Sequence, residues 1–249
     1  MSRAMEHWLR GPATAFCPGC GHGILLGALV RALDELKVDR KKLLFVSGIG
    51  CAAWIPSPNI KADTLHTLHG RAVAYATGAK LARPELTVIV ISGDGDLTSI
   101  GGNHLIHAAR RNLDLTVICA NNSIYGMTGG QTASTTPIGA RSATDPQGNR
   151  FRPFDLCRLV LAAGAQYAAR WPVTRPRPLI DSIKKAITTK GFTFVDVISP
   201  CPTQFGRRNA YDEITQLYQN LDSICCAPGE AKTAEQAAFE MGEFGAAHE

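Results

Sequence analysis

The stretch "LTVIVISGDGD" (Leu86–Asp96) joins an unbroken apolar run to a loop in which glycine and aspartate alternate. A second run, "LDLTVICANN" (Leu113–Asn122), ends in two asparagines. Apolar runs without polar alternation are typical of strands that are covered on both faces. The segment "GGNHLIHAARRN" (Gly101–Asn112) between them has the small residues of a helix that packs closely on a sheet. The stretch therefore predicts a strand–helix–strand unit, in which both strands end in polar loops.

The same alternation extends outward from this unit. Further apolar runs are "LLFVSGIG" (Leu43–Gly50) and "FTFVDVI" (Phe192–Ile198). Helical patterns occupy His22–Leu36, Gly70–Ala82 and Arg177–Gly191. Strands that alternate with helices favour an α/β fold with a doubly wound parallel sheet. In such sheets ligands bind beyond the carboxyl ends of the strands, where the glycine-rich and polar loops of this chain fall.

Composition limits the range of architectures and partners. The chain has 249 residues, a formal net charge of +5 and 45% hydrophobic residues, which suits an ordinary globular protein with one large domain. We expect a single domain over residues 1–220 and a C-terminal tail over residues 221–249. The basic residues are scattered, apart from Arg110-Arg111 and Arg207-Arg208, so we expect no nucleic-acid partner.

Targeting signals and cysteines indicate the compartment. The start "MSRAMEHWLRGP" (Met1–Pro12) lacks the apolar stretch of a signal peptide, and no later segment has the apolar run of a membrane span. We expect a cytoplasmic protein without a membrane partner. In a reducing compartment, eight cysteines indicate metal binding or redox chemistry more than a disulfide framework. Cys119 and Cys157 lie in apolar runs and are expected to pack as small hydrophobes.

Polar groups at the two strand ends fit a magnesium ion that holds a diphosphate. Such an ion needs a carboxylate and neutral oxygens, and phosphate oxygens complete its octahedron. Asp94 offers the carboxylate, Asn122 the amide oxygen and Ile124 a backbone carbonyl. Gly93 and Gly95 let the backbone approach the phosphates. A lone Gly-Asp-Gly is more often a turn, but two asparagines that end 28 residues beyond Asp94 make the magnesium interpretation strong.

A Cys-x-x-Cys pair near the start of the chain is ambiguous by itself. In "FCPGCGHG" (Phe16–Gly23), Cys17 and Cys20 are set among glycines and a proline. Two cysteines can bind zinc, run thiol–disulfide exchange or carry part of an electron-transfer cluster. The pair alone leaves all three roles open.

Six motifs together resemble a known family. Asp94 and Asn122 lie in a pattern that looks like the diphosphate-binding motif of thiamine-diphosphate enzymes. From Cys17 to about Asn209, the chain resembles the β subunit of 2-oxoacid:ferredoxin oxidoreductases. The motifs, in order, are "CPGCGHG", "SGIGCA", "LHGRA…ATGAKLA", "GDGDLTSIGGNHLIHAARRN", "NNSIYGMTGGQ" and "PCPTQFGRRN". The resemblance implies a thiamine-diphosphate-binding fold with thiamine diphosphate, Mg²⁺ and one 4Fe–4S cluster.

The resemblance also assigns the cysteines. Four thiolates suit an iron–sulfur cubane, although they suit tetrahedral zinc as well. Zinc cannot accept the electrons that a thiamine-dependent oxidation releases, so the cluster is the better interpretation. Cys225 and Cys226 lie outside the family motif and are expected to be spare. The implied cluster ligands are Cys17, Cys20, Cys51 and Cys201.

Further cofactor contacts follow from the same motifs. His69, in "LHGRA", matches a histidine that lies at the cofactor in this family and is expected to be catalytic, the alternative being a packing role at a helix start. Met127 matches a residue of the substrate pocket. The expected cofactor-binding set is Ile49, Gly50, Cys51, Ala52, His69, Gly93, Asp94, Gly95, Asp96, Asn122, Ile124, Tyr125, Gly126, Met127 and Thr128.

The implied reaction is coenzyme A-dependent oxidative decarboxylation of a 2-oxoacid, with electrons passed through the cluster to ferredoxin. The glutamate that activates the cofactor lies on the companion α subunit in this family, so we expect the chain to be active only with that subunit; further small subunits stay open. "CAAWIPSP" and "ADTLHTLHGRA" look most like the versions in 2-oxoglutarate-specific members, which predicts conversion of 2-oxoglutarate to succinyl-CoA.

Three alternatives remain at this point. The 2-oxoacid can instead be pyruvate or a branched-chain acid, because the partner also carries specificity residues. A non-redox thiamine-diphosphate decarboxylase or synthase would share Asp94 and Asn122 but need no cluster. A zinc-stabilised binding module would use the four cysteines and bind no thiamine diphosphate.

Overall fold

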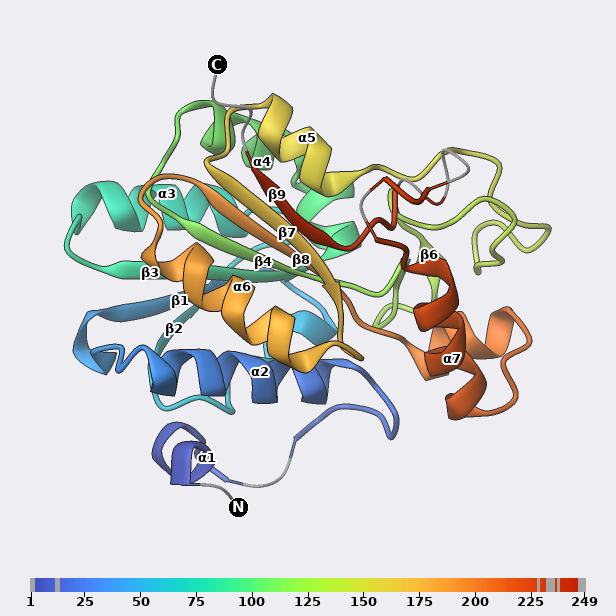
Figure 1. Ribbon diagram of the computed structural model, residues 1–249, viewed down its shortest axis with the longest axis horizontal. Helices are drawn as coiled ribbons and strands as arrows, with labels where there is room; N and C mark the ends of the chain where they lie inside the picture. The colour runs from blue at the N-terminus through green and yellow to red at the C-terminus, as the bar shows by residue number, and fades with distance from the viewer. Residues whose placement is uncertain (1–2, 12–13, 228, 232–235, 237, 246–249) are drawn as a thin grey trace.

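One mainly parallel sheet organises the protein (Figure 1). The computed structural model describes residues 3–11, 14–227, 229–231, 236 and 238–245. In that part of the chain the sheet has seven strands in the order β2-β1-β3-β4-β8-β7-β9, and only the β7–β9 pair is antiparallel. The doubly wound α/β fold is confirmed. The strands are β1 Leu43–Ser47, β2 Asp63–His66, β3 Thr87–Gly93, β4 Thr116–Asn121, β7 Tyr167–Pro172, β8 Thr193–Ile198 and β9 Gly242–Gly245.

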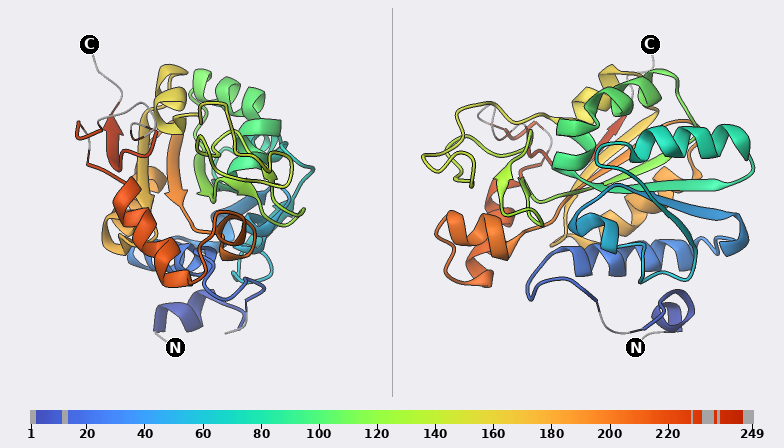
Figure 2. Two further views of the ribbon diagram at one scale, coloured as in Figure 1. Left: turned by 90° about the vertical axis from the view of Figure 1, so that its right-hand side faces the viewer. Right: turned by 180° about the vertical axis from the view of Figure 1, so that it is seen from behind.

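Helices cover both faces of the sheet (Figure 2). Helix α2 turns the buried side chains of Leu25, Leu29 and Leu33 toward one face, because leucines four residues apart share a stripe of the helix. That face carries α1, α2 and α6, and the other carries α3, α4 and α5. The helices are α1 Arg3–Trp8, α2 His22–Glu35, α3 Ala72–Ala82, α4 Gly102–Arg110, α5 Leu156–Ala162, α6 Pro176–Thr188 and α7 Ile214–Ile224.

The loops that carry the predicted chemistry open at one edge of the sheet. Because β1, β3 and β4 are parallel neighbours, the loops that follow them emerge side by side. The long polar segment 128–153 lies over this edge. It is tied down by a short antiparallel pair, β5 Ile124–Tyr125 with β6 Gln131–Thr132. The sequence therefore positions the site through the parallel register of the central strands.

Three strands beyond the predicted ones, β2, β7 and β9, widen the sheet. In strand β7 the fully buried Arg170 interrupts the apolar sequence pattern, so the strand lacks the unbroken apolar run by which the other strands were predicted. Strand β9 pairs with β7, and the boundary predicted at residue 220 falls inside α7. The described part of residues 221–249 is thus built into the sheet and its flank, which corrects the peripheral position expected for it. Residues 228, 232–235, 237 and 246–249 of that segment lie outside the described residues.

The structure also tests two expectations about membranes and cysteines. Within the described residues, no helix combines the length and apolar character that crossing a bilayer requires. Cys119 and Cys157 are fully buried, as predicted. All eight cysteines are free thiols.

Candidate active site

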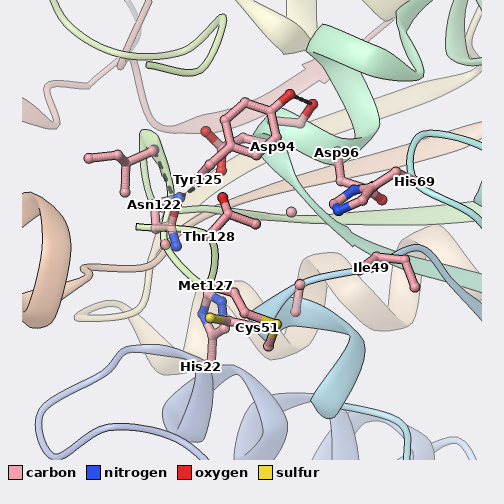
Figure 3. Close-up of a pocket in the computed structure, with 16 residues that line it drawn as sticks. His22, Ile49, Cys51, His69, Asp94, Asp96, Asn122, Tyr125, Met127 and Thr128 are labelled. Carbon is pink, nitrogen blue, oxygen red and sulfur yellow. Dashed lines mark hydrogen bonds and ion pairs between the residues drawn. The ribbon is translucent and has the colours of Figure 1, made fainter. Parts of the chain in front are cut away.

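One open pocket lies at the carboxyl edge of the sheet (Figure 3). Every residue of the predicted cofactor-binding set lines it. His22 lines it too, and the sequence analysis missed this residue even though it follows Cys20 by two positions. Cys51 and His22 lie at one end of the view, Asp94 and Asn122 at the other, with Met127 and Thr128 between them (Figure 3). Four loops at one edge of the sheet therefore bring the residues predicted for the magnesium–diphosphate site next to Cys51 of the predicted cysteine cluster.

Asp94 is the buried carboxylate of the pocket, with 1% of its surface exposed. Its Oδ1 accepts a hydrogen bond from the Asn122 N–H at 3.3 Å, and its Oδ2 accepts one from the Thr135 hydroxyl. Burial raises the pKa of Asp94 to about 7 in spite of these bonds. A buried carboxylate that is costly to ionise suits a bound divalent cation, which compensates its charge. Thr135 comes from the long polar loop, where only the Ser/Thr-rich composition signalled a role.

The two asparagines after β4 point in different directions. Asn121 is buried and donates from Nδ2 to Asp196 in the core at 3.1 Å, and its Oδ1 accepts the Ser123 N–H at 3.2 Å. Asn122 lines the pocket, and its Oδ1 accepts the Ile124 N–H at 3.2 Å. The first asparagine thus fixes the turn and the second presents oxygen to the site. The Asn-Asn motif alone could not assign these separate tasks.

Asp96 serves as the anchor of His69. The Nδ1 of His69 lies 2.6 Å from Asp96 Oδ1, which also accepts the Gly70 N–H at 2.8 Å, and the Ser92 hydroxyl donates to Oδ2. A carboxylate that accepts from Nδ1–H leaves Nε2 as the ring nitrogen free to act. His69 also lines the pocket, as the catalytic expectation requires. His66, in contrast, contacts the Ser47 hydroxyl at 3.1 Å and does not line the pocket.

Two glycines make room in the pocket. A Cβ on Gly95 would lie 2.6 Å from the ring of Tyr125, whose hydroxyl donates to the Gly95 carbonyl at 2.8 Å. A Cβ on Gly126 would lie 3.5 Å from Asn122 Nδ2, 3.6 Å from Cys201 Sγ and 3.7 Å from Cys51 Sγ. Gly126 therefore marks the point where the side chain of Asn122 comes near two of the cysteines.

The four predicted cluster cysteines come together from three separate loops. Cys17, Cys51 and Cys201 all raise the pKa of Cys20 electrostatically, which requires that they lie close to it. Burial, with a smaller contribution from these thiols, raises the pKa of Cys20 to about 12, and burial raises that of Cys51 to about 11. Among the described residues, no three His, Cys, Asp or Glu side chains are close enough to hold one metal ion.

His22 lies between the thiols and the pocket. Its ring is 1% exposed, and its Nδ1 lies 2.7 Å from the Ser199 hydroxyl. Burial lowers the pKa of His22 to about 4, so the imidazole is neutral at physiological pH. Ser199 lies two residues before Cys201 in the chain. The hydrogen bond therefore fixes the Cys20 and Cys201 loops against each other.

Comparison with protein families places this pocket in a known class. Residues 48–197 match the family "Thiamine pyrophosphate enzyme, C-terminal TPP binding domain". This span includes the loops that follow β1, β3 and β4, but it excludes Cys17, Cys20 and Cys201. The matched span thus contains Cys51 and every residue of the pocket except His22, whereas the other three predicted cluster cysteines lie outside it.

Individual relatives narrow the class. The chain is 53% identical to the 2-oxoglutarate synthase subunit KorB of Methanocaldococcus jannaschii over 92% of this chain and 86% of that protein. It is 38% identical to the 2-oxoacid:ferredoxin oxidoreductase 2 subunit beta of Aeropyrum pernix over 92% of this chain and 76% of that protein. A solved structure, the 2-oxoglutarate:ferredoxin oxidoreductase from Magnetococcus marinus with 2-oxoglutarate, coenzyme A and succinyl-CoA bound, matches with a TM-score of 0.82 and 35% identity, over 95% of this chain and 78% of that one. The chain belongs to the family of 2-oxoacid:ferredoxin oxidoreductase β subunits.

Proposed function

We propose that the chain is the β subunit of a coenzyme A-dependent 2-oxoglutarate:ferredoxin oxidoreductase, which converts 2-oxoglutarate to succinyl-CoA and carbon dioxide. One observation carries this proposal. The Nδ2 of Asn122 and the thiols of Cys51 and Cys201 all lie within 4 Å of the position that a Cβ on Gly126 would occupy. A cofactor held by the first group is therefore next to an electron acceptor held by the second.

The oxygen ligands fit a magnesium-bound diphosphate. Asp94, the amide oxygen of Asn122 and the carbonyl of Ile124 would hold Mg²⁺, and the backbone at Gly93 and Gly95 would approach the phosphates. Asp94 is buried and its pKa is raised, so a bound cation would stabilise its ionised carboxylate, which supports this assignment. Thiamine diphosphate, when bound, supplies the electron sink for decarboxylation.

The need for an electron acceptor favours an iron–sulfur cluster over zinc. Four thiolates suit either centre, but zinc cannot accept the electrons that a thiamine-dependent oxidation releases. The thiols of Cys51 and Cys201 both lie within 4 Å of the position of a Cβ on Gly126, beside the pocket. Cys17, Cys20, Cys51 and Cys201 would therefore hold a 4Fe–4S cluster.

His69 is the proposed catalytic group of this chain. Because Nδ1 donates to Asp96, Nε2 is left to bind either a diphosphate oxygen or the substrate oxygen whose charge changes during the reaction. Because Asp96 is 3% exposed and accepts three hydrogen bonds, it holds the ring in one orientation.

Partners complete the site in this proposal. Both aspartates of the pocket are engaged with this chain, Asp94 by Thr135 and Asp96 by His69. The activating glutamate would come from the α subunit, and ferredoxin would take the electrons. We place the complex in the cytoplasm, since thiolate-bound iron needs a reducing compartment. Relatives named for 2-oxoglutarate favour that substrate over pyruvate or branched-chain 2-oxoacids.

The test is anaerobic co-purification of this chain with the product of the adjacent α-subunit gene. The complex is then assayed with 2-oxoglutarate, pyruvate and a branched-chain 2-oxoacid, each with coenzyme A and a viologen. We expect coenzyme A-dependent viologen reduction with 2-oxoglutarate as the best substrate. Carbon dioxide release without viologen reduction would show the non-redox class instead.

Metal analysis separates the cluster from zinc. The wild-type complex should contain about four iron and four acid-labile sulfide per β subunit. Cys51→Ala should lose them, and the matched control Cys226→Ala should keep them, because Cys226 does not line the pocket and its thiol donates to the Gln236 carbonyl at 3.8 Å. Zinc without sulfide in the wild type would overturn the assignment.

A further inference from the structure

His22 is a buried histidine to which the proposed reaction gives no task. Its side chain is 1% exposed and still lines the cofactor pocket, at the end where Cys51 lies (Figure 3). Helix α2 begins at His22, two residues after Cys20. Because buried polar atoms nearly always have a hydrogen-bond partner, the partners of the two ring nitrogens indicate what this residue does.

Contacts on several sides fix the orientation of the His22 ring. Its Nδ1 lies 2.7 Å from the Ser199 hydroxyl, and the Phe16 ring packs edge-on against the imidazole with 5.8 Å between the ring centres. The backbone is held as well, because the Gly21 N–H donates to the Pro200 carbonyl at 3.1 Å. A Cβ on Gly21 would lie 2.6 Å from the Ser199 hydroxyl oxygen, so the two segments are in close contact. The ring cannot turn without movement of the loops around it.

The second ring nitrogen of His22, Nε2, has no partner in the protein. Within the described part of the chain it forms no hydrogen bond. A buried imidazole is neutral and carries a single N–H. When the Ser199 hydroxyl donates to Nδ1, that N–H is on Nε2. Negative charge beside Nε2 favours this arrangement, because it attracts an N–H and repels a lone pair.

The cysteine group lies at the same end of the pocket as the His22 ring. The backbone N–H of His22 donates to the Cys20 thiol, and this bond lowers the pKa of that thiol against the larger, opposite effect of burial. Cys51 lines the pocket together with His22 (Figure 3). The thiols of Cys51 and Cys201 also lie within 4 Å of the position of a Cβ on Gly126, another lining residue. His22 therefore contacts the cysteine group through its backbone and has an unpaired ring nitrogen at the same end of the pocket.

We propose that the ring N–H of His22, at Nε2, donates a hydrogen bond to a sulfur of the 4Fe–4S cluster and so raises the reduction potential of that cluster. This inference rests on the proposed function, which places the cluster on Cys17, Cys20, Cys51 and Cys201. One added electron makes the cluster more negative, so an N–H aimed at a sulfur stabilises the reduced form more than the oxidised form. His22 transfers no proton and forms no covalent bond. It makes the cluster easier to reduce.

A redox titration of the anaerobic αβ complex, followed by electron paramagnetic resonance without substrate, measures this effect. His22→Leu should lower the equilibrium constant for reduction of the cluster about tenfold, which is a shift of about −59 mV for one electron. His22→Gln, whose side-chain amide also offers an N–H, should keep the potential close to that of wild type. His107→Leu is the matched control and should change nothing, because His107 is exposed on α4, across the sheet from α2.

A purely structural role of His22 would give a different result. If the ring only holds the two loops together, His22→Leu should lower the stability of the complex while the cluster potential stays equal to that of wild type. Equal potentials in wild type, His22→Leu and His22→Gln would therefore overturn the inference.

A second measurement needs no variant and covers the case in which His22→Leu fails to assemble a cluster. The wild-type complex is prepared with histidine that carries nitrogen-15 only in its ring, and electron spin echo modulation is recorded on the reduced cluster. We expect a weak coupling between a ring nitrogen and the cluster spin, which His22→Gln should lose. A loaded wild type without this coupling overturns the inference alone, whereas a wild type without iron and acid-labile sulfide overturns the proposed function.

Discussion

Asp94 combines two opposing requirements at the scale of a single residue. Its carboxylate is buried, which destabilises the ionised form, yet a magnesium ion needs that form. The bonds from Thr135 and from the Asn122 N–H hold the group in place without removing its charge. Burial of the Asp94 carboxylate therefore lowers the stability of the cofactor-free chain, and in the proposed function it favours binding of the cation.

Asp94→Asn should separate stability from binding. The raised pKa means that the protonated carboxyl contributes stability to the cofactor-free fold at low pH, and that this contribution is lost progressively as the pH rises from 3.8 to about 7. The amide cannot ionise, so the variant should be more stable than wild type above about pH 7 and similar to it below about pH 4. Thermal unfolding of the cofactor-free protein measures this.

The same variant should lose affinity for thiamine diphosphate with Mg²⁺, measured by calorimetry. Thr98→Val, which removes a bond to the backbone carbonyl of Asp94 rather than to its carboxylate, is the control that should keep most of the binding. A variant that is less stable at high pH and still binds the cofactor would contradict the role given to Asp94.

Gly95 and Gly126 should respond differently to alanine. At Gly95 the added methyl would collide with the Tyr125 ring at 2.6 Å, so Gly95→Ala should displace that loop and lower stability by about 1–3 kcal/mol. At Gly126 the nearest atoms lie at 3.5–3.7 Å, so Gly126→Ala should fold normally. It should nevertheless narrow the junction between cofactor and cluster. Chemical denaturation and thiamine diphosphate binding are measured for both variants. An equal loss of stability in Gly95→Ala and Gly126→Ala would contradict the difference in packing described here.

At the scale of elements, a buried polar network connects the sheet to the metal-binding turn. Arg170 of β7 is fully buried and donates to Asp196 of β8 at 2.8 Å and to Asp155, the N-cap of α5, at 2.9 Å. Asp196 accepts from Asn121, which fixes the turn that presents Asn122. The Arg170 guanidinium also donates to the Glu240 carbonyl at 3.2 Å, just before β9. The C-terminal segment is thus coupled to the site.

Arg170→Met should be strongly destabilising because it leaves Asp196 without its cation in the core. Removal of one partner from a buried ion pair costs about 3–5 kcal/mol. The matched control is Arg177→Met in the exposed pair with Glu35, which should cost about 0–1 kcal/mol. Denaturant unfolding compares the two free energies. A difference below about 1 kcal/mol would mean that the network does not support the sheet.

Elements that follow a clear period were predictable, and those fixed by tertiary contacts were not. The apolar runs before Gly93 and Asn122 gave β3 and β4, together with the edge at which their polar ends meet. Strand β7 was not predicted because Arg170 interrupts its apolar pattern. In the fold, the carboxylates of Asp155 and Asp196 compensate the charge of Arg170. Thr135 was not predicted because it stands in no motif, and only folding brings its hydroxyl to Asp94. His22 stands in the motif "CPGCGHG", but only the structure shows that it lines the pocket.

At the scale of the whole molecule, the parallel sheet brings the cysteines to the side of the pocket. Loops after β1 and β8 and the loop before α2 bring the thiols together, and Cys51 itself lines the pocket. In the proposed function, electrons from the cofactor would pass directly to this group of thiols. The rim of the pocket is open to a partner at Met127, which is 49% exposed.

The chain alone should bind cofactor but not turn over. Purified without its α subunit, it should bind thiamine diphosphate with Mg²⁺ and show no viologen reduction with 2-oxoglutarate, because the activating glutamate belongs to the partner in the proposed complex. Addition of the purified α subunit should restore activity. Full activity of the isolated chain would contradict a site completed at the subunit interface.

The most direct measurement of the central claim is rapid-freeze electron paramagnetic resonance on the anaerobic αβ complex. After 2-oxoglutarate and coenzyme A are mixed in, the spectrum should develop the signal of a reduced 4Fe–4S cluster within one turnover, and Cys51→Ala should show none. Consumption of 2-oxoglutarate by the wild type with no iron–sulfur signal would contradict the claim that this chain seats the cofactor beside its own cluster.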